Sequence, residues 1–117
     1  MNLEEYVQWT ERTCASLGDK KIDNLHMILG IVTEAGELAD IFKKNTAYRK
    51  EIDWINVQEE LGDILFYMAA FCRINKLDFD RILETNINKL RVRYPEKFSE
   101  DHANNRDLQK EREILEK

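Results

Sequence analysis

Apolar side chains recur every three or four positions along most of the chain, the spacing of one face of an α-helix. The pattern predicts four helices, over residues 3–17, 23–44, 53–75 and 78–95. Asp23 is a favourable N-cap for the second helix. Pro95 ends the fourth, because proline lacks the backbone N–H that a continuing helix needs. The sequence therefore predicts an all-α fold, a four-to-five-helix bundle with antiparallel helices.

Residues 99–117 form a densely charged tail. The run RDLQKEREILEK is rich in helix-forming residues, but its apolar stripe consists only of Leu108, Ile114 and Leu115. We expect this tail to be helical. It either frays in solution or packs on a partner subunit, and we favour packing. Residues 1–98 are then the body of a single domain, and residues 99–117 are its C-terminal tail.

The composition supports the prediction of an all-α fold and disfavours two classes of function, membrane insertion and binding to nucleic acid. A chain of 117 residues with one proline and four glycines is one domain with few turns, which disfavours an all-β fold. No apolar run approaches the roughly 20 residues that span a bilayer, so we expect no membrane segment. The net charge of −5 disfavours binding to a nucleic acid polymer, which requires a basic surface.

The two cysteines and the first residues suggest a location. Cys14 and Cys72 are too few for a disulfide framework, and the polar start MNLEEYVQWTERT does not resemble a signal peptide. We therefore expect reduced thiols and a cytoplasmic protein. Cys72 lies in an apolar helical stripe and is predicted to be core, as is Trp54.

Two related motifs, TEAGE and EELGD, place acids inside apolar helical stretches. At about 100° per residue, Glu34 and Glu60 fall within the apolar arcs of their helices, and Glu37 and Asp63 fall at the margins. Surface helices normally keep acids opposite the apolar stripe. Buried carboxylates without partners are unfavourable or become protonated. Packing the two helices together would create one cluster of four carboxylates, which divalent cations would neutralise.

The donor types indicate which cation. All four side chains offer oxygen, so magnesium, with manganese as a substitute, is favoured over zinc. Gly36 and Gly62 precede the second acid of each motif, and a mid-helix glycine suits a place where a backbone or a phosphate comes close. E-x-x-E and E-x-x-D are also common on helix surfaces. It is the repeat of the pattern within two apolar arcs that favours a metal site.

A basic stripe follows on the fourth helix, in ETNINKLRVRYPEKF. Asn86, Lys89 and Arg93 share one polar edge of that helix. The stripe is either a solvated face or, together with a metal-binding acid cluster, a phosphate clamp. Further phosphate-binding candidates surround the connection between the second and third helices, or else are ordinary charges near a helix end: Lys43, Lys44, Arg49 and Lys50. His26, close to Glu37 on the second helix, is either structural or a substrate contact.

The acid motifs and the basic stripe together resemble one known protein family. ILGIVTEAGELADIFKK, VQEELGDILFYMAAFCRINKLDF and NINKLRVRYPEKF resemble the MazG-like family of all-α nucleotide pyrophosphohydrolases, especially its short single-domain members, over about residues 22–98. The resemblance implies that magnesium is bound by Glu34, Glu37, Glu60 and Asp63. It implies that phosphates are faced by Asn86, Lys89, Arg93 and Tyr94. It also implies a homodimer or homotetramer with sites near subunit interfaces. Thr33 departs from the family, in which paired glutamates often open the first acid motif.

The predicted function is magnesium-dependent hydrolysis of a nucleoside triphosphate, preferably a deoxynucleotide, to the monophosphate and pyrophosphate. Glu34 or Glu37 would position or deprotonate the attacking water. Three alternatives stay open at this point. They are a non-catalytic helical interaction module with a metal-stabilised acid cluster, a nucleotide-binding regulator, and an enzyme similar to phosphoribosyl-ATP pyrophosphohydrolases.

Overall fold

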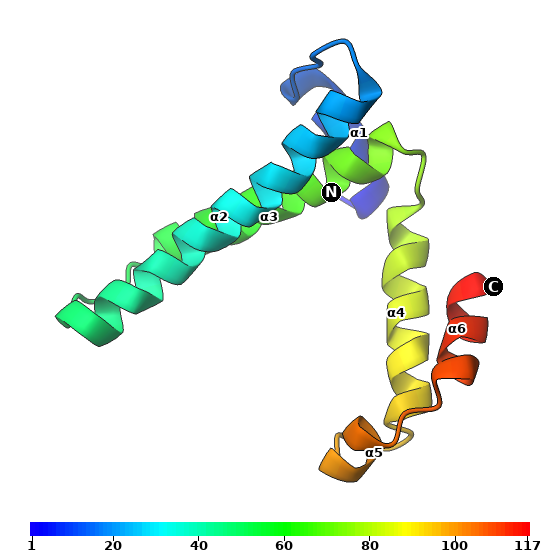
Figure 1. Ribbon diagram of the computed structural model, residues 1–117. Helices are drawn as coiled ribbons and strands as arrows, with labels where there is room; N and C mark the ends of the chain where they lie inside the picture. Colours follow the sequence, from blue (N-terminus) through cyan, green and yellow to red (C-terminus); the bar gives the residue numbers. More distant parts are fainter. The chain divides into compact units, whose positions relative to one another are not determined.

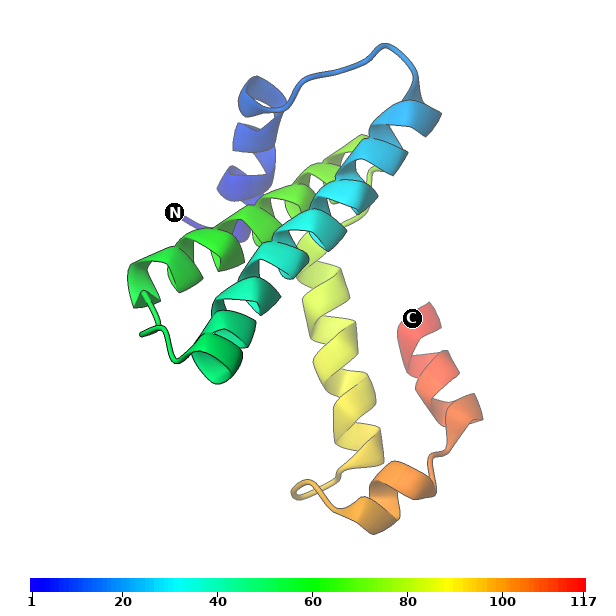
Figure 2. The same ribbon diagram turned by 60° about the vertical axis from the view of Figure 1, so that its left-hand side comes forward.

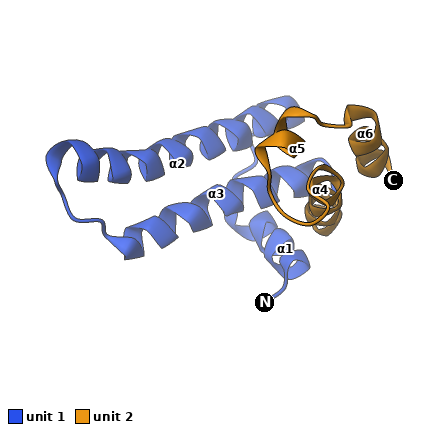
Figure 3. Ribbon diagram, turned by 90° about the horizontal axis from the view of Figure 1, so that it is seen from below, with its two compact units in different colours: residues 1–77 blue, residues 78–117 orange.

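The protein, described by a computed structural model over residues 1–117, has six α-helices and no strands. The prediction of an all-α fold is confirmed. The helices exceed the predicted four or five because the tail forms two of them. The chain divides into two compact units, Met1–Leu77 and Asp78–Lys117 (Figure 3). This boundary lies inside the region that we expected to be the body of one domain, so the division after residue 98 stays a prediction.

The first unit is built on a long helical hairpin. It contains α1 (Leu3–Thr13), α2 (Lys20–Tyr48) and α3 (Trp54–Ile74). Helices α2 and α3 lie side by side and antiparallel, and α1 packs against α3 (Figures 1 and 2). The most deeply buried side chains along the hairpin belong to Met27, Ala69 and Ala70, none of which is exposed. Cys72 is 5% exposed, which confirms it as core.

The start of α2 differs from the prediction. Its N-cap is Asp19, whose carboxylate accepts a hydrogen bond from the Lys21 amide, and Asp23 lies in the first turn. Asp23 instead holds the preceding loop, because its carboxylate accepts hydrogen bonds from the Leu17 amide (2.8 Å) and the Ser16 hydroxyl (3.1 Å). This loop also shortens α1, which ends at Thr13 instead of residue 17.

The turn between α2 and α3 is tightly held. Helix α2 continues past the predicted Lys44 to Tyr48, since no glycine or proline stops it, and Arg49 ends it in a left-handed conformation (φ 55°). The side-chain amide of Asn45 then donates to the Lys50 carbonyl at 2.7 Å. Helix α3 begins where it was predicted, and Asp53 caps it by accepting hydrogen bonds from two backbone amides.

Several apolar side chains of the hairpin are exposed. On α2 a row formed by Leu25, Leu29 and Val32 is between 52% and 62% exposed. Trp54 is 61% exposed, so its prediction as core is wrong within this chain. It lies at the first position of α3, and its ring meets that of Phe42 edge-on. None of the six helices, not even α2 with its 29 residues, combines the length and hydropathy that crossing a membrane requires.

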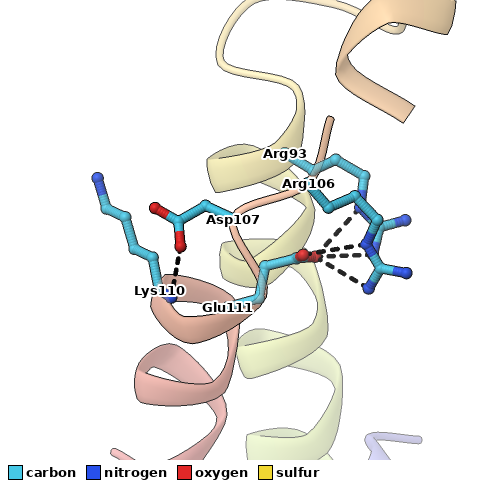
Figure 4. A network of polar contacts seen from close by, with 5 residues as sticks. All are labelled: Arg93, Arg106, Asp107, Lys110 and Glu111. Atoms are coloured by element: carbon cyan, nitrogen blue, oxygen red, sulfur yellow. Dashed lines mark hydrogen bonds and ion pairs between the residues drawn. The ribbon is translucent and has the colours of Figure 1, made fainter. Parts of the chain in front are cut away.

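The second unit contains α4 (Phe79–Arg93), α5 (Glu100–Asn104) and α6 (Leu108–Glu116). Helix α4 begins after the cap Asp78 and ends just before Pro95, as predicted. Helix α6 packs on α4 of the same chain. The contact centres on Glu111, which is 2% exposed and lies between Arg93 and Arg106 (Figure 4). The tail is therefore helical, as expected. Its packing on a partner subunit stays a prediction.

Candidate metal centre between two helices

The pairing of α2 with α3 brings three predicted acids together. Glu34 and Glu37 come from α2 and Glu60 comes from α3, and each offers a carboxylate oxygen within 4.8 Å of the others. Acids three apart share one side of a helix, so the antiparallel partner needs to supply only one more carboxylate at the same level. Three acidic oxygens at such spacing match the donor set of a hard divalent cation.

Burial makes this cluster unusual. Glu60 is only 6% exposed. One oxygen each of Glu34 and Glu60, the Oε2 atom, is buried and has no hydrogen-bond partner. A buried acceptor without a donor is costly, and a protein rarely retains two side by side without a ligand. These orphaned oxygens fit a small cation.

The electrostatics agree with the geometry. The pKa of Glu60 is raised from 4.5 to about 7, first because the adjacent Glu34 carboxyl favours a proton on Glu60, then because of burial and the negative charge of Glu37. Carboxylates this close cannot all ionise without compensation. A proton on Glu60 supplies that compensation in the metal-free protein, and a divalent cation would replace it.

The fourth predicted ligand belongs to a second group of acids. Asp63 lies with Glu59 and Glu60 in a set whose ligand atoms are all within 4.8 Å of one another, so Glu60 is common to both sets. Glu59 was not among the predicted ligands, although its spacing of four from Asp63 places both on one helix face. Tyr6 of α1 lies beside this group. Burial, and secondarily the charge of Asp63, raises its pKa.

A groove of about 710 Å³ opens beside the acids. Glu37 and Glu60 form one end of it, and Lys44, Lys50 and Asn56 lie toward the α2–α3 turn. The remaining lining comes from Thr33, Gly36, Asp40, Ile41, Glu51 and Asp53. The acid cluster is therefore open to a polar ligand on this side.

The other predicted site residues are distributed over both units. His26 lies on α2 with its Nδ1 atom buried and without a partner, and its ring is 6.2 Å from that of Tyr67. Asn86, Lys89 and Arg93 share one side of α4 in the second unit. Arg93 donates to Glu111 at 2.7 Å and lies over the ring of Tyr94.

The glycines behave differently from one another. No atom other than chain neighbours lies within 4 Å of where a Cβ would stand at Gly36 or Gly62. The protein itself therefore makes no close approach there, and Gly36 faces the open groove. The close approach is between Gly30 and Tyr67, since a Cβ atom at Gly30 would overlap the Tyr67 ring. This role of Gly30 was not predicted. The only sequence signal for this contact is the position of Gly30 within the apolar run MILGIV.

Comparison with known proteins gives a concordant result. Residues 23–98 match the sequence model of a family described as the MazG nucleotide pyrophosphohydrolase domain. A protein of Rattus norvegicus named dCTP pyrophosphatase 1 is 32% identical over 84 residues, which cover 67% of this chain and 49% of the rat protein. The chain thus spans about half the length of the curated relative that it matches. No solved structure gives a significant match.

Proposed function

The chain belongs to the MazG nucleotide pyrophosphohydrolase family, and on this basis we propose that it hydrolyses nucleoside triphosphates to a monophosphate and pyrophosphate. The observation that carries the proposal is the cluster of Glu34, Glu37 and Glu60, with two orphaned buried oxygens at the end of an open groove. Because a relative is named dCTP pyrophosphatase, dCTP is the first substrate to test.

MazG-family enzymes are typically dependent on a divalent metal, and we infer that magnesium is the ion here, with manganese as a substitute. It would be held by Glu34, Glu37, Glu60 and Asp63. Their donors are all oxygen, which suits these hard cations. When bound, the ion supplies positive charge to the triphosphate and makes water more acidic.

The side chains differ in the roles that they can take. Glu37 is exposed and lines the groove, so it is better placed than the half-buried Glu34 to position water and accept its proton. The water oxygen forms a bond to the α-phosphorus, and the bond from that phosphorus to the α–β bridging oxygen breaks. The bridging oxygen and its electron pair leave with pyrophosphate, while the water proton passes to the carboxylate.

We propose that the polar row of α4 contacts the phosphates. Asn86 is exposed and Lys89 is half-buried, and the Lys89 ammonium forms no ion pair with a carboxylate. The assignments of Arg93 and Tyr94 have less support, because Glu111 already engages the Arg93 guanidinium. His26 is proposed as a substrate contact by way of its exposed atoms, since its Nδ1 is buried.

We also propose that the active species is a homodimer or homotetramer. The exposed row of Leu25, Leu29 and Val32 on α2 supports this, because a second copy can bury such a face. Trp54, exposed on α3, is a further candidate for such an interface.

A release assay tests the activity. Pyrophosphate is measured with each of the common ribo- and deoxynucleoside triphosphates, with and without magnesium, for the wild type and for Glu60→Gln. We expect magnesium-dependent release from at least one deoxynucleotide and its loss in the variant. Full activity of Glu60→Gln would contradict the site. Stabilisation by magnesium without turnover of any nucleotide would contradict the enzymatic function and favour a regulatory or structural module.

A further inference from the structure

The end of the groove farthest from the acid cluster is built on the hydrogen-bonded turn between α2 and α3. Arg49 adopts the left-handed conformation that ends α2. The Lys50 amide then donates to the Lys44 carbonyl at 3.3 Å, and the Lys50 carbonyl accepts from the Asn45 side chain at 2.7 Å. Both backbone polar groups of Lys50 are thus fixed to the end of α2, so its side chain leaves the turn from a defined position at the groove.

Lys50 is the groove's unpaired cation. The other lysine of the lining, Lys44, lies 2.7 Å from Asp40, a carboxylate that Lys43 also approaches at 3.7 Å. Asp53 uses one carboxylate oxygen to cap α3. No carboxylate lies within ion-pair distance of the Lys50 ammonium. An ammonium group in this state can bind a further anion without first breaking an internal pair.

The lining chemistry indicates what this end of the groove binds. No aromatic side chain lines it, so a nucleobase would find no ring on which to stack. Asn56, which is half-buried, adds a side-chain amide that makes no hydrogen bond within the chain. Glu51 and Asp53 also line this end of the groove, but Asp53 caps α3. Lys50 and Asn56 are the donors there that suit phosphate oxygens whose nearer neighbours are held at the acid cluster.

We propose that the turn end of the groove binds the two terminal phosphates of the substrate, and pyrophosphate after cleavage, with Lys50 as the principal contact and Asn56 as a second donor. This inference rests on the proposed function and adds a location to it. The nucleoside then extends from the acid cluster away from the turn. Lys50 is thereby a binding residue for the leaving group, separate from the basic row of α4.

Calorimetric titration with magnesium pyrophosphate tests the assignment without relying on turnover. Lys50→Ala should weaken binding about tenfold, the value of one charge-assisted hydrogen bond. Lys50→Arg should retain most of the affinity. The matched control is Lys43→Ala, because the Lys43 side chain is 68% exposed and lies outside the groove lining. This variant should bind magnesium pyrophosphate with the wild-type affinity.

Titration with deoxycytidine monophosphate in magnesium separates the two products. If the assignment is correct, Lys50→Ala binds the monophosphate as the wild type does. Unchanged pyrophosphate affinity would overturn the inference. A loss confined to the monophosphate would also overturn it and would place the nucleoside monophosphate at this end of the groove. Failure of the proposed function has a different signature, since it would leave every nucleoside triphosphate uncleaved by the wild-type protein.

Discussion

The aromatic ring of Tyr67 lies directly against the backbone of Gly30, where any Cβ atom would overlap three of its ring carbons. Gly30 is one helical turn before Glu34, and Tyr67 is two turns after Glu60. The contact therefore sets how closely α2 and α3 approach beside the acids. Because the ring fits only over a glycine, the spacing of the metal centre depends on a residue that has no side chain.

Gly30→Ala should destabilise the protein and weaken the metal site together. Helix propensity alone would add stability of about 1 kcal/mol, but inserting a methyl group into a packed seam costs about 1–3 kcal/mol. We expect a lower unfolding free energy by urea titration and a weaker magnesium affinity by calorimetry. Gly62→Ala, where the space is open, should instead be neutral or slightly stabilising. A Gly30→Ala variant with raised stability and unchanged magnesium affinity would contradict this account.

The pKa of Glu60 predicts how the metal-free protein responds to pH. The carboxyl titrates near 4.5 when unfolded and near 7 when folded. Between these values the folded protein holds a proton that the unfolded chain has lost. Raising the pH through this range therefore lowers the unfolding free energy, and the loss is complete above about pH 7. Thermal melting across this range, in chelator, checks the slope, which Glu60→Gln should reduce.

Magnesium should reverse that dependence. Ligands must be deprotonated before they coordinate, so binding below about pH 7 should release a proton from the cluster, and the affinity should fall as the pH is lowered. Calorimetry at one pH in buffers of different ionisation enthalpy measures the released protons directly. Equal apparent enthalpies in all the buffers would show that Glu60 is already ionised in the metal-free protein.

The acid pairs were predictable because each pair belongs to a single helix, whose periodicity can be read without knowledge of its neighbours. A carboxylate inside an apolar arc can be seen from periodicity alone, and Glu34 and Glu60 came together as that pattern predicts. Whether an apolar arc is covered depends on partners that periodicity does not name. Trp54 satisfied the pattern for a core residue and is nevertheless 61% exposed.

Contacts between distant residues were less predictable. Asp23 was predicted to cap α2, but Asp19 caps it, because the loop before the helix uses Asp23 as its hydrogen-bond acceptor. Arg93 belongs to a plausible phosphate row, but its engagement by Glu111, 18 positions later, could not be inferred from either residue. The family match also ends before Glu111, at residue 98.

The exposed row on α2 predicts a change of assembly on substitution. Replacing Val32, which is 62% exposed, with glutamate would place a charge in any interface formed by this face, where burial without a partner is costly. Sedimentation velocity should show a shift towards monomer with unchanged helical circular dichroism. Thr46→Glu, an exposed polar position of the same helix, is the control and should keep the wild-type assembly. Identical sedimentation of both variants would assign the interface elsewhere.

We expect the packing of α6 on α4 to depend on the carboxylate of Glu111. Its carboxylate accepts hydrogen bonds from Arg106 and Arg93, which lower its pKa despite burial. Its stabilising effect is thus present above the unfolded-state pKa and is lost as the pH falls through the lower folded-state value. Glu111→Gln should remove amide hydrogen-exchange protection from residues 108–116 and leave α2 and α3 protected. Arg112→Ala, which breaks an exposed pair with Glu116, should change little, because such pairs contribute at most about 1 kcal/mol. Protection retained in Glu111→Gln would show that apolar contacts alone hold the helix.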